Sequence, residues 1–180
     1  YKRDASGKIV VGADGLPMKA EKKSVIGNIQ PDWTGSAALG INYKGISLNA
    51  LVSMQQGGDI FSATEQGAVG SGTAARTTAN GRINTFVEGV TETGGYSTKM
   101  VSAQEYWGTI SGIDEEFIYD ASHMKLKELA LGYSFSKGLL QRISNNPVKS
   151  LRISVVGRNL LYFYKNTPGT APDASAYSSA

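Results

Sequence analysis

Few residues in this sequence are suited to acid–base or nucleophilic catalysis. The 180-residue chain contains one histidine and no cysteine, so a serine triad would have to use His123 as its base. No residues near His123 have the spacing of such a triad. The lack of cysteine also excludes a disulfide framework, a thiolate zinc site and a cysteine nucleophile. We therefore expect His123 to be a packing residue, and we expect no catalytic site and no enzyme activity.

Two further motifs have residue types that hold a cation or a phosphate group. Asp114, Glu115 and Glu116 form a run of acids, but calcium loops need more oxygen ligands at regular spacing. Residues 67–73, GAVGSGT, are rich in glycine but lack the Gly-Lys-Ser/Thr end of a phosphate loop. We expect the acids to form a solvated surface, and the sequence predicts neither a metal site nor a cofactor.

The composition argues against several other classes of protein. The formal net charge is only +3, and the one basic cluster is Lys19, Lys22 and Lys23. A nucleic-acid-binding surface gathers its basic residues on one face, so we expect no nucleic-acid partner. Hydrophobic residues make up 41% of the chain, which argues against disorder. No apolar run reaches the roughly 18 residues of a membrane-spanning helix. The chain starts at Tyr1 without signal-peptide features, as a fragment or a processed chain does.

Four segments alternate between apolar and small or polar residues, which is the two-residue period of a β-strand. They lie at residues 36–43, 46–54, 129–135 and 151–163. The first two are joined by Lys44 and Gly45, which predicts a hairpin. We also expect a short helical turn at residues 137–143 and irregular structure at residues 1–34 and 166–180.

Residues 55–120 form a long glycine-rich segment between the second and third predicted strands. Compact domains rarely contain a loop of this length unless it is functional, and residues 103–107 have the pattern of a helical turn. Short connections at one end of the strands and long ones at the other are typical of outer-membrane β-barrels. Strands of about ten residues are also long enough to cross a bilayer. A half-buried sheet of a soluble protein shows the same alternation, so both interpretations stay open.

Five blocks of sequence, spread over residues 26–165, have a combination typical of one family. They are IGNIQPDWTG at 26–35, YKGISL at 43–48, GGDIF at 57–61, YDASHMKLKEL and LGYS at 119–134, and GRNLL at 157–161. In this order they resemble the SusC-like TonB-dependent outer-membrane transporters of Bacteroidetes-type bacteria. Lys125 and Lys127 stand where that family often has arginine, which keeps the charge.

The resemblance implies an all-β fold, in which antiparallel strands form the C-terminal part of a 22-stranded transmembrane β-barrel with long extracellular loops. The expected organisation is an extracellular loop at 1–34, a hairpin at 35–54, a long extracellular loop at 55–122, the last visible strand pair at 123–164 and a truncated extracellular loop at 165–180. The plug and most of the strands would then lie outside this chain.

The same resemblance implies part of a TonB-dependent importer of oligosaccharides or peptides in the bacterial outer membrane. The implied partners are the remainder of the barrel and its plug, a SusD-like surface lipoprotein, the TonB energy-coupling system, the substrate and membrane lipid. The alternative is a soluble extracellular or periplasmic β-sheet ligand-binding module. The two differ in what surrounds Leu39, Ile41, Leu48 and Val52, because these side chains face lipid in a barrel and a second layer in a soluble protein.

Aromatic residues of the long loop are the candidate substrate contacts. Tyr96, Tyr106 and Trp107 have faces that suit the apolar surfaces of sugar rings. A loop of this length also needs a small core of its own, so we favour a role of these side chains in packing the loop or contacting a partner protein over ligand contact. Further candidates are polar residues of the strand faces, namely Asn42, Asn49, Arg152 and Arg158.

Overall fold

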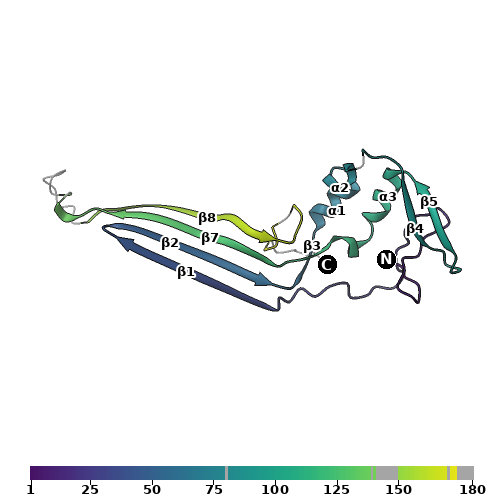
Figure 1. Cartoon of the computed structure of the whole chain (residues 1–180), viewed down its shortest axis with the longest axis horizontal. Helices are drawn as coiled ribbons and strands as arrows, with labels where there is room; N and C mark the ends of the chain where they lie inside the picture. The colour runs from purple at the N-terminus through teal and green to yellow at the C-terminus, as the bar shows by residue number, and fades with distance from the viewer. Residues whose placement is uncertain (80, 139, 141–149, 170, 174–180) are drawn as a thin grey trace. The chain divides into compact units, whose positions relative to one another are not determined.

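The computed structural model describes residues 1–79, 81–138, 140, 150–169 and 171–173 (Figure 1). Within it the chain forms two compact units. The strand unit comprises Gln30–Gly58 and Ala121–Asn166, and the loop unit comprises Tyr1–Ile29, Asp59–Asp120 and Thr167–Ala180. Each unit therefore brings together segments that are far apart in the sequence.

The strand unit is an antiparallel sheet of four strands with the order β1-β2-β7-β8. Its strands are β1 (Trp33–Tyr43), β2 (Ile46–Gln56), β7 (His123–Ser134) and β8 (Arg152–Lys165), drawn as four long arrows in Figure 1. The four strands that the alternation predicts are all present, and their ends differ from the prediction by a few residues. The observed secondary structure is therefore mostly antiparallel sheet, as the predicted all-β class requires.

The turn between β1 and β2 sets the register of the sheet. Lys44 and Gly45 have φ angles of 45° and 88°, the left-handed values that a two-residue type I′ hairpin turn requires. A side chain at position 45 would place its Cβ 2.7 Å from the carbonyl oxygen of Ser134, so only glycine fits this turn. The predicted hairpin is confirmed, with Tyr43 opposite Ile46.

The register places apolar side chains in rows on one face of the sheet, which we call the apolar face. Direct partners across a sheet point to the same side, and one row crosses all four strands at Ile41, Leu48, Leu131 and Val155. The flanking rows on this face are Leu39, Ala50, Leu129 and Gly157, and Tyr43, Ile46, Tyr133 and Ile153. Leu39 is 57% exposed and Val155 is 72% exposed, so this face is uncovered in the described chain.

The opposite face of the sheet, which we call the polar face, carries small and polar side chains. Its rows include Asn42, Ser47, Gly132 and Ser154, and Gly40, Asn49, Ala130 and Val156. Nearer the other end of the strands, Nε of Arg158 lies 3.2 Å from the carboxylate of Glu128. Small and polar side chains therefore predominate on this face over these rows, with Val156 as an exposed apolar exception.

Ser122 connects the ends of three strands at the edge of the strand unit. Its side chain is buried, and its hydroxyl oxygen accepts a hydrogen bond of 2.8 Å from the backbone N–H of Gly57, just after β2. The same oxygen accepts one of 3.2 Å from the Gln56 amide. Its carbonyl oxygen accepts a bond of 3.3 Å from Asn166 N–H, just after β8. One buried serine therefore fixes where β2, β7 and β8 end or begin.

The loop unit contains short helices around a small apolar core. They are α1 (Ala63–Gly70), α2 (Ala75–Thr78), α3 (Ala103–Ile110) and the 3₁₀ helix η1 (Asp114–Phe117). Val69, Ala74, Ile110 and Phe117 are buried against one another. None of the helices in the described part of the chain is long and apolar enough to cross a membrane.

The start of α3 is fixed by a capping box. The Ser102 hydroxyl oxygen accepts a 3.2 Å hydrogen bond from the backbone N–H of Glu105, and the Glu105 carboxylate accepts one of 3.4 Å from the backbone N–H of Ser102. The predicted helical turn at residues 103–107 is the first part of this helix. The helical turn expected at residues 137–143 lies mostly outside the described residues.

Two strands of three residues, β3 (Asp59–Phe61) and β6 (Ile118–Asp120), pair at the base of the long excursion. Asn28 N–H donates to the Asp59 carboxylate at 2.7 Å, and Asp59 N–H donates to the Asn28 carbonyl at 2.7 Å. A side chain at Gly27 would place its Cβ 2.9 Å from the same carboxylate. Two of the five sequence blocks, at 26–35 and 57–61, therefore meet through these contacts.

A hairpin of β4 (Thr85–Val90) and β5 (Tyr96–Val101) carries a second apolar cluster. Val11 is buried in it, and its N–H donates to the Val90 carbonyl at 2.9 Å. A side chain at Gly89 would place its Cβ 2.5 Å from Val11, so glycine is required for this close approach. Residues 9–11 form isolated bridges, one of them between Val10 and Val90, within the segment expected to be irregular. That segment ends earlier than expected, because β1 begins at Trp33.

Candidate functional site

Two of the three predicted substrate contacts lie side by side on α3. The ring centroids of Tyr106 and Trp107 are 5.0 Å apart, with an angle of 74° between the ring planes. Both rings are partly buried against the core that contains Ile110. Tyr96 lies apart from them on β5 and is 70% exposed. The packing role is thus visible for Tyr106 and Trp107, and ligand contact stays a prediction for all three.

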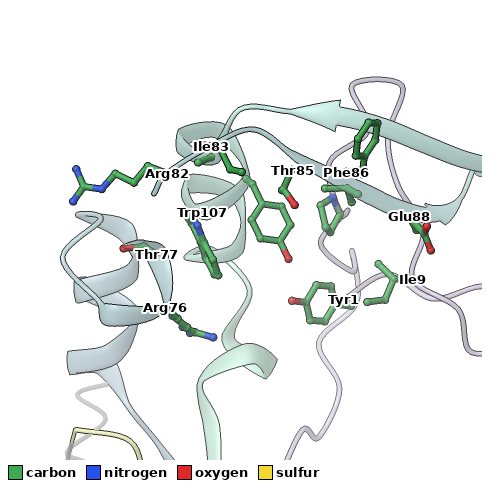
Figure 2. A pocket seen from close by; sticks show the side chains of 14 residues that line it. Tyr1, Ile9, Arg76, Thr77, Arg82, Ile83, Thr85, Phe86, Glu88 and Trp107 are labelled. Carbon is green, nitrogen blue, oxygen red and sulfur yellow. The ribbon is translucent and has the colours of Figure 1, made fainter. Parts of the chain in front are cut away.

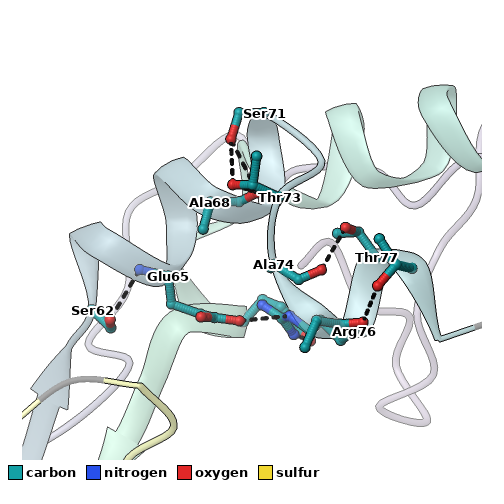
Figure 3. Close-up of polar contacts among 11 residues, drawn as sticks. Ser62, Glu65, Ala68, Ser71, Thr73, Ala74, Arg76 and Thr77 are labelled. Atoms are coloured by element: carbon teal, nitrogen blue, oxygen red, sulfur yellow. Dashed lines mark hydrogen bonds and ion pairs between the residues drawn. The ribbon is translucent and has the colours of Figure 1, made fainter.

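Arg76 on α2 is the electrostatic centre of the helical region (Figure 3). Its Nε lies 3.3 Å from the Glu65 carboxylate on α1, and its Nη1 lies 2.9 Å from the Glu116 carboxylate on η1. The guanidinium also lies over the rings of Trp107 and Phe117, at 5.6 and 5.0 Å from their centroids. Its Nη2 is buried without a hydrogen-bond partner among the described residues, and the ring faces stabilise the cation instead.

The three consecutive acids are solvent-exposed or partly exposed, as expected of a solvated surface, and each also contacts a distant segment. Asp114 accepts a hydrogen bond of 3.0 Å from Gln66, and Glu115 lies 2.6 Å from Arg3. Glu116 is paired with Arg76. The 3₁₀ turn of η1 directs the three carboxylates to partners from distant segments, which their adjacency in sequence does not reveal. Within the described part of the chain, no group of three or more His, Asp or Glu residues is arranged to hold a metal ion.

Tyrosine hydroxyls near this network have raised pKa values. Burial raises the pKa of Tyr106 and also that of Tyr119. Burial and the 2.7 Å hydrogen bond that the Tyr1 hydroxyl donates to Glu116 raise the pKa of Tyr1. These groups are therefore protonated donors at neutral pH and do not act as bases.

Two adjoining cavities flank Trp107. One has a volume of about 330 Å³, and its lining includes Phe86 and Glu88 (Figure 2). The other has a volume of about 400 Å³, and its lining includes Gln104. Both volumes lie at the lower end of the roughly 300–1,000 Å³ range of small-molecule sites. The residues common to both linings are Thr77, Arg82, Ala103 and Trp107.

The other residues considered from the sequence have structural surroundings. His123 is buried at the start of β7, with Nδ1 2.8 Å from the Ala121 carbonyl oxygen and its ring against that of Tyr162. This is the environment of the expected packing residue. Residues 67–73 form the end of α1 and the turn after it, so they do not lead from a strand into a helix as a phosphate loop does.

No family model matches the chain. In sequence it is similar to TonB-dependent receptor P3 of Formosa agariphila (strain DSM 15362 / KCTC 12365 / LMG 23005 / KMM 3901 / M-2Alg 35-1). The two are 28% identical over 173 residues, which cover 96% of this chain and 16% of the receptor. A search of solved structures finds the RagAB peptide importer in the 'closed-closed' state, with a TM-score of 0.48 and 22% identity over 91% of this chain and 17% of that one. The chain spans about a sixth of the length of each.

The similarity to a TonB-dependent receptor extends over nearly the whole chain. It therefore includes the strands of the sheet and also the excursion with its helices.

Sequence reasoning did not single out Arg76, Glu65 or Arg82. Arg76 and Glu116 are 40 residues apart, and no periodicity connects them. Glu65 has a local signal, because it follows the N-cap residue Ser62 by three positions and its backbone N–H donates to the Ser62 hydroxyl oxygen. That signal indicates the start of α1, and it does not indicate the pairing with Arg76.

Proposed function

We propose that this chain is the C-terminal wall segment of a TonB-dependent importer in the bacterial outer membrane. The observation that carries the proposal is the uncovered apolar face of the strand unit. Monomeric soluble proteins rarely expose contiguous apolar patches larger than a few hundred Å². On this face a row of apolar side chains crosses all four strands, and the opposite face carries mainly small and polar side chains. Lipid on one side and a wet lumen on the other account for both faces.

Strand length and the positions of aromatic side chains support the same proposal. The four strands have 11, 11, 12 and 14 residues. At about 3.3 Å per residue and a tilt of about 45°, eleven residues cover about 25 Å, which is the height of the apolar band of outer-membrane barrels. Tyr43 and Tyr133 lie at the end with the short turn, and Trp33 and Tyr164 lie at the other end. Aromatic girdles at both interfaces have this placement.

We further propose the organisation that the family resemblance implies. The sheet is part of a 22-stranded SusC-like barrel that is completed by the rest of the same protein, with its plug inside. The Lys44–Gly45 turn faces the periplasm, and the segments 1–34, 55–122 and 165–180 are extracellular. A SusD-like lipoprotein binds outside, TonB supplies energy, and the cargo is an oligosaccharide or a peptide. The exposed ring of Tyr96 and the partly buried Tyr106 and Trp107 are the proposed substrate contacts on the excursion.

The barrel and the soluble binding module differ in what surrounds four side chains of β1 and β2, and these surroundings favour the barrel. Leu39 and Ile41 are 57% and 50% exposed, and Leu48 and Val52 are half-buried by neighbours in their own sheet. The described chain supplies no second layer over them. A soluble module would need another polypeptide to cover this entire face.

Cysteine labelling of the full-length protein in outer-membrane preparations tests the proposal. The chain has no cysteine, so Ile41→Cys and Asn42→Cys each introduce one thiol into this segment, on opposite faces of β1. We expect the thiol at position 41 to react with a lipid-soluble maleimide and to be protected from a charged one, and the thiol at position 42 to show no such protection by lipid. Equal labelling of both thiols by the charged reagent in the native protein would contradict lipid contact on the apolar face.

A further inference from the structure

The cavity of about 400 Å³ beside Trp107 contains one charged residue, Arg82, in its lining. Among the described residues that line this cavity there is no acid, and the Arg82 side chain is exposed. Much of the remaining wall is formed by glycines, at positions 70, 72 and 108, which leave the backbone accessible. A guanidinium in a cavity without acids favours a carboxylate, which it binds through two parallel N–H donors.

The geometry of Arg82 leaves donors available for such a ligand. Its Nη2 donates to the Gly72 carbonyl at 2.9 Å, and a guanidinium has five N–H donors. In Figure 2 its side chain extends away from Phe86 and Glu88. Arg76 differs, because carboxylates on α1 and η1 already neutralise it. Arg82 also has a φ of 59°, a left-handed value that is unusual for a residue with a side chain and is found at ligand-binding positions more often than elsewhere.

The other side of the cavity suits a ring. Trp107 contributes to its wall, and aromatic faces pack well on flat ligand rings. Gly108 follows in the same helix, and a Cβ placed there would meet no atom within 4 Å. The space in front of α3 is therefore open at this position.

We propose that this cavity binds a cyclic carboxylate, with its ring against Trp107 and its carboxylate accepting hydrogen bonds from Arg82. The inference rests on the proposed importer function, in which the ligand is part of the cargo, and it names the chemistry of that cargo. A uronic-acid sugar and the C-terminal residue of a peptide ending in an aromatic side chain share this chemistry.

Calorimetric titration of the full-length protein with two pairs of probes tests the proposal. The first pair is D-galacturonate and D-galactose, and the second is N-acetyl-L-phenylalanine and its amide. We expect the carboxylate member of at least one pair to bind about ten-fold or more tightly than its neutral partner, since hydrogen bonds between charged groups are stronger than those between neutral ones. The pair that shows the preference identifies a sugar or a peptide as the source.

Two glycine variants provide a matched comparison. Gly108→Leu fills the cavity, and Gly67→Leu places the same side chain on α1, where a Cβ also meets no atom within 4 Å but the residue lines neither cavity. We expect Gly108→Leu to abolish binding and Gly67→Leu to retain it. Arg82→Gln should remove the preference for the carboxylate and leave the weak affinity for the neutral ring.

Three results would overturn the proposal: no binding of either carboxylate, equal binding within both pairs, or unchanged binding by Gly108→Leu. The protein can insert in the outer membrane, show the expected labelling at positions 41 and 42, and still give one of these results. In that case only the proposed chemistry of the cargo is contradicted. Loss of the labelling pattern contradicts the importer function instead.

Discussion

Arg152 on β8 donates a hydrogen bond of 2.7 Å to the hydroxyl of Ser47 on β2, two strands away. The bond is possible because Gly132 of β7 lies between them on the polar face. A Cβ at position 132 would lie 3.1 Å from two guanidinium nitrogens and 2.7 Å from the serine oxygen. Because Gly132 has no side chain, the Arg152 side chain can extend across β7 and reach β2.

Gly132→Val should therefore displace the Arg152 side chain and destabilise the sheet. We expect a cost of about 1–3 kcal/mol, the usual range for inserting atoms into an occupied space. Urea unfolding of the full-length protein, followed by the heat-dependent shift in gel mobility, measures it. Gly40→Ala on β1 is the control, because its Cβ meets only the end of the Asn49 side chain, at 3.2 Å. Equal urea midpoints of unfolding for the two variants would show that the contact between Arg152 and Ser47 adds no stability.

An arginine at position 41 should be far more damaging than one at position 42. Ile41 lies in a central row of the apolar face and Asn42 on the polar face. In lipid, an arginine costs about 2–4 kcal/mol at the bilayer midplane and less towards the interface, where Ile41 lies two residues from Tyr43, whereas lumen positions tolerate charge. We expect Ile41→Arg to lower the amount of folded protein in the outer membrane and Asn42→Arg to leave it near the parent level. The opposite order would reverse the assignment of the two faces.

Replacing Arg76 should loosen the helical region without affecting the sheet. Arg76→Met leaves the carboxylates of Glu65 and Glu116 without their cation, and removes the contacts with two aromatic rings. The Arg76 side chain is 29% exposed, so we expect about 1–3 kcal/mol, less than the loss of a fully buried pair. Hydrogen exchange should speed up in α1, α2 and η1. Arg82→Met, which loses a single hydrogen bond to Gly72, should change exchange in these helices little.

The loop unit should lose stability at alkaline pH through Tyr106. Burial raises its pKa in the folded state above the ordinary value of 10.0. Above about pH 10 the unfolded chain therefore releases a proton that the folded chain keeps, so folding becomes less favourable as pH rises. Tyr106→Phe should remove part of this dependence, measured as the unfolding midpoint between pH 8 and 11. Tyr96→Phe removes one exposed phenol and is the matched control; an identical pH profile for the two variants would contradict the role of Tyr106.

The strands of the sheet were predictable because their signal is local. Each has apolar and polar residues in alternation over about seven to thirteen positions, and a two-residue turn that ends in glycine, Lys44–Gly45, joins the first two strands. β3 and β6 have three residues each, too few for a period to be recognised. Val11 is buried because it contacts a strand about eighty residues away, and no local pattern contains that information.

The candidate site was predictable only in part. Tyr106 and Trp107 were recognisable as aromatic residues of a loop that needed a core, and both contact that core. The pairing of Arg76 with carboxylates on two other elements depends on how α1, α2 and η1 fold together. The cavity lined by Arg82 depends on Gly70, Gly72 and Gly108, which are separate in sequence. Each of these glycines taken alone indicates only a turn or a position of low helix propensity.

The short ladder between β3 and β6 has an evolutionary consequence. It joins the two ends of the excursion at Asp59 and Asp120, so the residues between them form a loop that is closed at its base. The entropy of closing such a loop grows slowly with length, by about 0.6 kcal/mol for each doubling. Changes in the length of the chain between Ser62 and Phe117 should therefore cost the four-stranded sheet little. Homologues that differ in cargo are expected to differ most in this segment and least at its two closing strands.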